Sequence, residues 1–457
     1  MVIGGINFNK EENMQQQFRR NLMALAVASA LGGASGMASA AGFALIEQSG
    51  SGMGNAYAGA AATGEDAGTV FFNPAAMSLI DTPQIAAGGH VIGLKAEFSG
   101  SGTRPVALGG GAATGGQGGD AGAPAIVPNF YFVMPIGDSM RFGVGVNVPF
   151  GLATEYDEDW LGRFQGVKSE LMTVNINPSI SFKVSEMFSI GAGINYQRID
   201  AELTNAVVLG AGQTGKATLE ADDDAWGWNA GVLFQPTAST KVGFSYRSKI
   251  EYKLDGTTTV TSDSGAPAAV AAAILSTGSA TADVTMPDSF SLSLAQALND
   301  RVELLADVTF TRWSEINRIN IVNPGNGTLR DSLVLDFDDT YRYSIGVNYK
   351  LDDDWKLKAG VAFDETPVKG ASSRTVRLPD NDRTWLSLGA QMKVKQNGRL
   401  DFGYSHLFVK DADIDFTRSQ QAPGQTTPTA SAGTATTVTG SYEGSVDIFS
   451  VQYTHSF

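Results

Sequence analysis

Connections of alternating length constrain this chain more than any other feature of its sequence. After residue 83, segments that alternate apolar with polar side chains are ended by clusters of Gly, Asn, Asp and Ser. Fourteen segments can be delimited, at 84–98, 126–136, 140–149, 168–184, 187–202, 225–236, 239–254, 282–297, 300–313, 340–351, 354–366, 383–396, 398–411 and 443–457. Every second connection is a tight turn, and the others are long loops, at 99–125, 150–167, 203–224, 255–281, 314–339, 367–382 and 412–442.

This alternation is typical of a transmembrane β-barrel, in which tight turns lie at one end of the wall and long loops at the other. In lipid every backbone donor and acceptor must be paired, so only helices or a closed barrel can span. The sequence therefore predicts an all-β fold, a 14-stranded antiparallel transmembrane β-barrel covering residues 84–457.

The last segment has one apolar and one polar face. Phe449, Val451, Tyr453 and His455 share a face because strand side chains repeat every second residue, and the chain ends on Phe457. An amphipathic last strand also occurs in soluble sheets. Together with the alternating connections, however, this last strand favours an outer-membrane barrel in contact with lipid and lipopolysaccharide. The assembly machinery of such barrels reads the terminal residue, here Phe457.

The N-terminal residues predict export. Arg19 and Arg20 precede an apolar stretch and a run of small residues, so 1–40 reads as a signal peptide, with Met14 as an alternative start. An exported chain of this length without Cys fits the outer membrane of a Gram-negative cell better than a disulfide-built secreted protein. Removing 1–40 takes a net +1 from the formal charge of −15 and leaves −16, which argues against nucleic acid as a partner.

Residues 41–83 predict a plug, or hatch. Fourteen strands enclose a lumen that side chains of the wall cannot fill. The 41–83 segment is rich in Gly and Ala, with little charge and no strand periodicity. A disordered linker is the alternative, but the run Val70-Phe-Phe-Asn-Pro-Ala-Ala-Met77 is too apolar for a solvated tether.

Several motifs resemble those of the long-chain fatty acid outer-membrane transporters. They are Ala41-Gly-Phe-Ala-Leu-Ile-Glu-Gln-Ser49, Gly54-Asn-Ala-Tyr-Ala-Gly59, Asn73-Pro-Ala75, Val127-Pro-Asn-Phe-Tyr-Phe-Val-Met-Pro135, Phe150-Gly-Leu-Ala-Thr-Glu155, Gly360-Val-Ala-Phe-Asp-Glu-Thr-Pro367 and Leu378-Pro-Asp-Asn-Asp-Arg383. The resemblance runs from Ala41 to Phe457, in order. It implies a monomeric barrel with a hatch that takes up hydrophobic molecules by passive diffusion, with lateral exit through a kinked third strand.

The resemblance also assigns roles to residues. It implies an inner pocket at Phe43 and Leu45 and a hatch turn at Asn73, Pro74 and Ala75. It further implies an acquisition groove among apolar runs of two long loops, at Leu203, Val207, Val208, Leu209, Val270, Ile274 and Leu275. Contiguous apolar loop residues commonly mark a binding site, although these two loops could instead only pack together as a lid.

The third segment predicts an irregularity in the wall. Pro149 lacks a ladder donor and Gly151 adds a flexible backbone point, with Phe150 between them. From the residues alone, the strand could simply end there. The resemblance favours a kink that leaves neighbouring ladder bonds unmade and serves as a lateral gate.

The cargo is less constrained. Fatty-acid members of the family place basic residues near the outer ends of the fifth and tenth strands, where this chain has Asn205 and Asp338. Substitute cations for a carboxylate lie nearby, at Arg198, Arg342, Arg374 and Arg383. Uncharged cargo such as alkanes or monoaromatic hydrocarbons would need no cation, so both cargo classes stay open.

Other classes of protein fit less well. His90, His406 and His455 lie inside predicted strands without a nucleophile elbow or a metal-spaced partner, so we expect no enzyme, no cofactor and no metal. A purely structural barrel needs no plug. A water-filled porin would conduct ions, whereas we expect negligible conductance from a plugged barrel.

Overall fold

The computed structural model describes residues 42–210, 212–262 and 277–457. The predicted signal peptide lies outside these ranges, as do the predicted groove residues Val270, Ile274 and Leu275. In the part of the chain that is described, none of the helices is long and apolar enough to cross a membrane.

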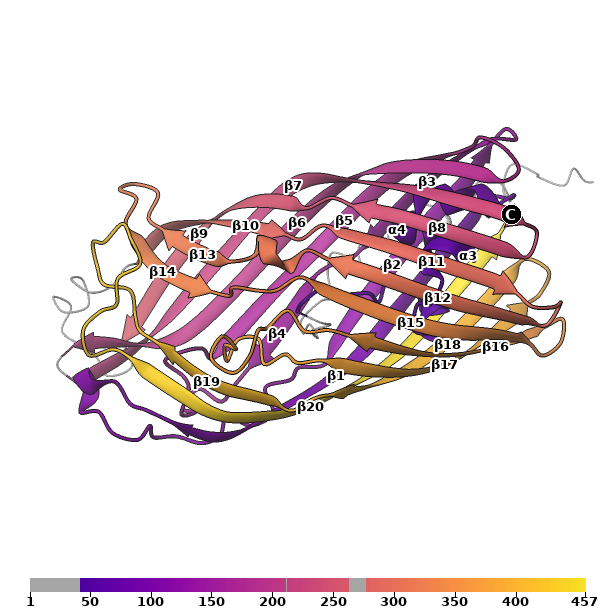
Figure 1. Cartoon of the computed structure of the whole chain (residues 1–457). Helices are drawn as coiled ribbons and strands as arrows, with labels where there is room; N and C mark the ends of the chain where they lie inside the picture. The colour runs from indigo at the N-terminus through magenta and orange to yellow at the C-terminus, as the bar shows by residue number, and fades with distance from the viewer. Residues whose placement is uncertain (1–41, 211, 263–276) are drawn as a thin grey trace, which may run out of the picture.

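One antiparallel sheet closes on itself to form the wall (Figure 1). The first strand, β1 (Gln84–Gly102), pairs along its whole length with the last, β20 (Thr436–Ser456), from Gln84 opposite Ser456 to Gly102 opposite Val438. The remaining strands are β2 (Ala125–Ile136), β3 (Met140–Asn147), β4 (Gly151–Glu155), β5 (Lys168–Lys183), β6 (Phe188–Gly210), β7 (Gln213–Thr237), β8 (Thr240–Arg247), β9 (Ile250–Ser262), β10 (Gly278–Met286), β11 (Ser289–Ala297), β12 (Val302–Thr311), β13 (Arg318–Val322), β14 (Leu329–Val334), β15 (Thr340–Lys350), β16 (Trp355–Asp364), β17 (Arg383–Val394), β18 (Gly398–Val409) and β19 (Ala412–Arg418).

The described strands amount to fourteen crossings of the wall. Four crossings are each interrupted once, as β3 with β4, β8 with β9, β10 with β11, and β18 with β19, and the β13–β14 hairpin belongs to a loop. The predicted 14-stranded antiparallel barrel is therefore confirmed. Short turns gather at the end that carries the C-terminus, and the long loops lie at the other end (Figure 1).

The prediction of loops at 203–224 and 255–281 was wrong in extent. β6 and β7 continue past the expected ends as a hairpin, with Leu203 opposite Leu219 and Val208 opposite Thr214, and β9 runs on to Ser262. Cross-strand pairing satisfies the backbone of these segments, and their Val and Thr residues favour strands. In the sequence, the predicted strands end where the apolar alternation stops, which marks only their lipid-facing part. The hydrogen-bonded pairing of the strands continues beyond it.

Side-chain alternation orients the wall. On β20, Phe449, Val451 and Tyr453 are exposed, and the intervening Ser450 and Gln452 are buried. Aromatic side chains on neighbouring strands also form an outward row of successive ring contacts, from Trp228 through Tyr246, Phe290, Phe310 and Tyr341 to Tyr343. Such apolar faces with aromatic girdles are what the lipid-facing side of a membrane barrel presents.

Residues 42–83 form the hatch, which lies inside the barrel near the short-turn end (Figure 1). Its elements are the short helices α2 (Gly50–Met53), α3 (Ala60–Thr63) and α4 (Thr69–Phe72) and the 3-10 helix η1 (Pro74–Leu79). Two further 3-10 helices, η2 (Val106–Leu108) and η3 (Trp313–Glu315), lie in loops. The hatch approaches the wall closely, since a Cβ built on Gly54 would lie 2.6 Å from the Cα of Gly389.

Asn73 joins the end of the hatch to the wall. Its side-chain oxygen accepts a hydrogen bond from the Ala75 amide at 3.0 Å, which caps η1. Its amide nitrogen donates to the carbonyls of Ala61 and Val232 at 2.7 and 3.0 Å. A single buried side chain therefore links two hatch elements to β7.

A group of buried and partly buried charges, the hatch ion network, also ties the hatch to the wall. Hatch residue Glu65 pairs with Lys356 and Lys358 at 3.0 and 2.8 Å, and Lys358 pairs in turn with Asp401 at 3.3 Å. Arg399 lies between hatch residue Asp66 and Asp401, 3.5 Å from each. Although burial opposes it, Lys356 and Lys358 hold the pKa of Glu65 well below its usual range. The network balances three carboxylates with three cations.

Candidate binding site for a hydrophobic ligand

A cavity of about 350 Å³, here called the outer cavity, opens at the long-loop end of the barrel. The β6–β7 hairpin supplies one wall, and the β13–β14 hairpin and the loop after β19 supply others. All four described residues of the predicted groove line it, at Leu203, Val207, Val208 and Leu209. Leu219, Ile321 and Leu329 extend its apolar surface. This surface could hold a hydrocarbon chain.

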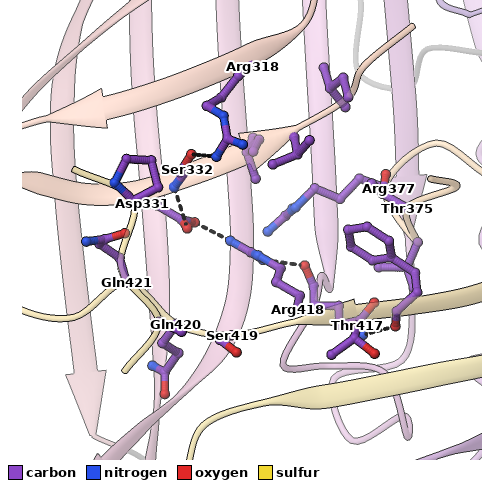
Figure 2. Close-up of a pocket in the computed structure, with 18 of the residues that line it drawn as sticks. Arg318, Asp331, Ser332, Thr375, Arg377, Thr417, Arg418, Ser419, Gln420 and Gln421 are labelled. Atoms are coloured by element: carbon purple, nitrogen blue, oxygen red, sulfur yellow. Dashed lines mark hydrogen bonds and ion pairs between the residues drawn. The ribbon is translucent and has the colours of Figure 1, made fainter. Parts of the chain in front are cut away.

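A second cavity of about 240 Å³, the side cavity, is drawn in Figure 2 and shares lining residues with the first. Its apolar lining includes Leu333, Leu335, Val376 and Phe416. Both cavities share the same polar boundary, formed by Asp331, Arg377, Arg418, Gln420 and Gln421. In Figure 2 the side chains of Arg377, from the loop before β17, and of Arg418, the last residue of β19, extend toward the same region.

Arg377 is a buried cation at this boundary. Its Nη1 donates to the Lys168 carbonyl and to Ser169 Oγ, both at 2.9 Å, and its Nη2 donates to the Thr204 carbonyl at 3.2 Å and to Asn205 Oδ1 at 3.1 Å. None of these partners is a carboxylate, and within the described residues its Nε has no hydrogen-bond partner. Burial, with a smaller effect of Arg418, lowers the pKa of Arg377 to about 9. The cavity thus holds a positive charge that lacks an acidic partner in the described chain.

Arg418 is the second cation, and it is paired. Its Nη1 donates to the Gln165 carbonyl at 2.7 Å, and its Nη2 forms an ion pair with Asp331. Neither Arg377 nor Arg418 was among the predicted cations. The only sequence signal for Arg377 was its place beside the 378–383 motif, and its contact with Asn205 joins residues far apart in the chain.

The predicted head-group cations do not come together. Arg198 lies on the outer face of the wall, in an exposed pair with Asp200 and Asp222, so its prediction as a cargo ligand was wrong. Arg374 and Arg383 are buried but both engage Asp380, through its carbonyl and its carboxylate respectively. They stabilise the loop between β16 and β17 and line neither of the two cavities.

The remaining predicted cation, Arg342, lines a third cavity of about 130 Å³, the inner cavity, beside the hatch. Its Nη2 donates to the Ala56 carbonyl at 3.0 Å, and its guanidinium lies 4.9 Å from the ring centroid of Trp385. Among described residues its Nε and Nη1 have no hydrogen-bond partner. Arg342 therefore has free donors in a mainly buried setting.

The N-terminal end of the hatch forms part of the same cavity. Leu45 lines it together with Pro149, Phe150 and Trp313. Phe43 packs edge-on against Trp313, with ring centroids 4.8 Å apart, and contacts Phe150 at 6.2 Å. The two predicted inner-pocket residues thus meet the third strand at its irregular point.

At that point the third strand is interrupted but does not end. β3 pairs with β2 as far as Val146, and the chain resumes after Phe150 as β4, which pairs with β5 and not with β2. The strand-termination alternative is therefore excluded. Hatch residues occupy the place of the missing partner: the Leu45 amide donates to the Pro149 carbonyl at 2.8 Å, and the Gly151 amide donates to the Phe43 carbonyl at 2.9 Å.

Comparison with known proteins agrees with this architecture. The family described as "Outer membrane protein transport protein (OMPP1/FadL/TodX)" matches residues 32–457. "Outer membrane protein P1" of Haemophilus influenzae is 31% identical over 430 residues, covering 86% of this chain and 90% of that protein. "Long-chain fatty acid transport protein" of Escherichia coli is 29% identical over 440 residues, covering 88% and 95% respectively. The crystal structure of a Pseudomonas aeruginosa FadL homologue superimposes with a TM-score of 0.84 at 27% identity, covering 91% of this chain and all of that one.

Proposed function

Because this chain belongs to the outer membrane protein transport family (OMPP1/FadL/TodX), it is an outer-membrane transporter of hydrophobic compounds, and we propose that its cargo is a long-chain fatty acid. The observation that best supports this proposal is the buried cation Arg377. A buried cation beside an apolar cavity suits an amphiphile with a carboxylate head and a long apolar tail. Uncharged alkanes and monoaromatics would gain nothing from that charge and are the alternative cargo.

The proposed route leads from the outer cavity to the inner cavity. A fatty acid first binds in the outer cavity and then reaches the inner cavity, where Arg342 offers free donors and Leu45 and Phe150 an apolar surface. Burial contributes roughly 0.8 kcal/mol per CH₂ group, so affinity rises with chain length without specific hydrogen bonds. We propose that movement along this route is passive diffusion.

The proposed exit is lateral, between β2 and β4. Ladder bonds are missing there, and the hatch residues Phe43 and Leu45 fill the interval. Withdrawal of these residues would open a path from the inner cavity through the wall. A fatty acid leaving sideways enters lipid and avoids the aqueous mouth at the short-turn end.

We further propose that the protein acts as a monomer among lipid and lipopolysaccharide. The pairing of β1 with β20 leaves the wall without a terminal edge that a second copy would have to cover. The C-terminal strand, ending on Phe457, is the proposed signal for the assembly machinery.

The cargo proposal predicts a clear preference. We expect the purified barrel to bind oleate more tightly than hexadecane or toluene, and a host lacking its own fatty-acid transporter to take up oleate when it carries this gene. Binding is measured by calorimetry in detergent and uptake with labelled compounds. Tighter binding of hexadecane or toluene than of oleate would replace the fatty acid by the uncharged alternative.

The lateral exit predicts a second result. Gly151→Phe places a bulky side chain in the proposed passage, where it would obstruct a moving acyl chain. An obstruction that raises the transfer barrier by about as much as overpacking costs a core, roughly 1–3 kcal/mol, slows transfer roughly 5- to 150-fold. We expect oleate uptake to fall within that range while heat-modifiable migration on gels stays normal. Gly370→Phe is the matched control, because nothing lies within 4 Å of a Cβ at that position. Undiminished uptake by a folded Gly151→Phe variant would exclude this exit.

A further inference from the structure

We infer that Asp331 is an internal stand-in for the cargo carboxylate, which occupies the arginine site of the empty protein and must be displaced when cargo binds. This inference rests on the proposed fatty-acid function and assigns specificity to a residue outside the hatch and the kink. The boundary between the outer and side cavities is then a site where one carboxylate replaces another.

The chemistry of the boundary supports exchange. Asp331 lines both cavities, and among the described residues it is the only acidic side chain that lines either of them. Arg377 and Arg418 line both cavities too, so two cations share this boundary with one carboxylate, while Arg318 and Arg330 each line one of the cavities. Asp331 pairs with Arg418, as the dashed line in Figure 2 shows, which leaves the second cation without a carboxylate from the described chain.

The two sides of the ion pair are attached differently. The arginines are held by backbone carbonyls, Arg418 by Gln165 and Arg377 by Lys168 and Thr204. Asp331 lies on the β13–β14 hairpin, which is joined to the barrel ladder by a single residue pair, Thr281 with Val322. The carboxylate therefore lies on a loop hairpin with one ladder pair to the wall, supplemented by hydrogen bonds of Leu329 to the Gln425 carbonyl and of Arg330 to the Ser279 carbonyl, whereas the cations are held by the carbonyls named above.

Exchange of one carboxylate for another conserves the local charge balance. A fatty acid whose tail lies on Leu203 and Val207 could place its head at Arg377 and Arg418 as Asp331 moves away, and neither cation would be left buried and unpaired. A neutral molecule cannot replace Asp331 in this way. The ion pair would then keep the passage between the two cavities closed to uncharged compounds.

The test is the affinity of the full-length barrel for oleate, with oleyl alcohol as the uncharged probe. Asp331→Asn removes the internal competitor and is expected to tighten oleate binding roughly tenfold. This factor assumes that Asp331 occupies the arginine site in about nine of ten wild-type molecules, so that only about one in ten can bind oleate directly. Asp331→Glu retains a carboxylate and is expected to bind oleate as the wild type does. Asp338→Asn is the matched control, since Asp338 lies in the same loop, pairs with Lys369 and lines neither cavity.

The outcomes separate this inference from the proposed function. Unchanged or weaker oleate binding by a folded Asp331→Asn variant would overturn it, as would equal shifts in Asp331→Asn and Asp331→Glu, because those would report hairpin packing and not charge. If the wild type binds oleyl alcohol as tightly as oleate, the fatty-acid function itself fails, whatever the Asp331 variants do.

Discussion

Arg377→Gln is expected to weaken oleate binding by about one to two orders of magnitude while leaving the binding of oleyl alcohol nearly unchanged. A hydrogen bond to a charged group contributes roughly 1.5–3 kcal/mol, and each 1.4 kcal/mol corresponds to about a tenfold change in affinity. Glutamine keeps part of the side-chain length and hydrogen-bonding capacity, so the loss reports mainly the charge. Calorimetric titration of the purified barrel with both ligands measures the difference.

Arg198→Gln is the matched control for this prediction. It removes the same charge from the outer face of the wall, where Arg198 pairs with Asp200 and Asp222, and it should not affect either ligand. Equal losses for oleate and oleyl alcohol in Arg377→Gln would show that the side chain only supports the loops around it. In that case the cavity would not select a carboxylate.

The second large effect concerns the hatch. Lys358→Met is expected to convert a barrel of negligible conductance into one with frequent openings in planar bilayers. Lys358 is almost fully buried between Glu65 and Asp401, and removing one partner of a buried ion pair costs about 3–5 kcal/mol. A cost of that size changes the fraction of undocked hatch by at least two orders of magnitude, since each 1.4 kcal/mol is about tenfold.

Two variants make this prediction specific. Lys350→Met removes a lysine of the short-turn end whose pair with Asp353 is exposed, and such pairs contribute little, so its conductance should stay that of the wild type. The double variant Lys358→Met with Asp401→Asn restores the balance of charges and should recover much of the closed state. Conductance that stays negligible in folded Lys358→Met would mean that packing alone holds the hatch.

The architecture was predictable because its signals are local. The period-two alternation of a strand such as 443–457 is set by the backbone itself, and Gly, Asn and Asp clusters end strands without reference to the rest of the chain. Counting fourteen strands and placing the hatch before Gln84 required only these patterns. The error in 203–224 arose because a hairpin beyond the lipid loses the apolar alternation but keeps its ladder.

The site was predictable only in part. Leu203, Val207, Val208 and Leu209 were singled out as apolar residues in a presumed loop, and all line the outer cavity. Arg198 was proposed from its position near a strand end, but its side chain points outward. Successive residues of a strand point to opposite faces, so a shift of one residue in the expected register reverses the predicted direction. Arg377 was missed because its partners come from the far ends of other strands and loops.

The amino-acid sequence by itself determined a closed barrel with a plug, since alternation, turn residues and the Gly- and Ala-rich composition of the hatch segment act through near neighbours. The tertiary structure alone decided which cations meet at the cavities and that hatch residues Phe43 and Leu45 occupy the interval beside Pro149. Contacts such as Arg377 with Asn205 or Asp331 with Arg418 depend on the closure of the ring. Closure brings together strands far apart in the chain, and no local pattern records which side chains then face one another.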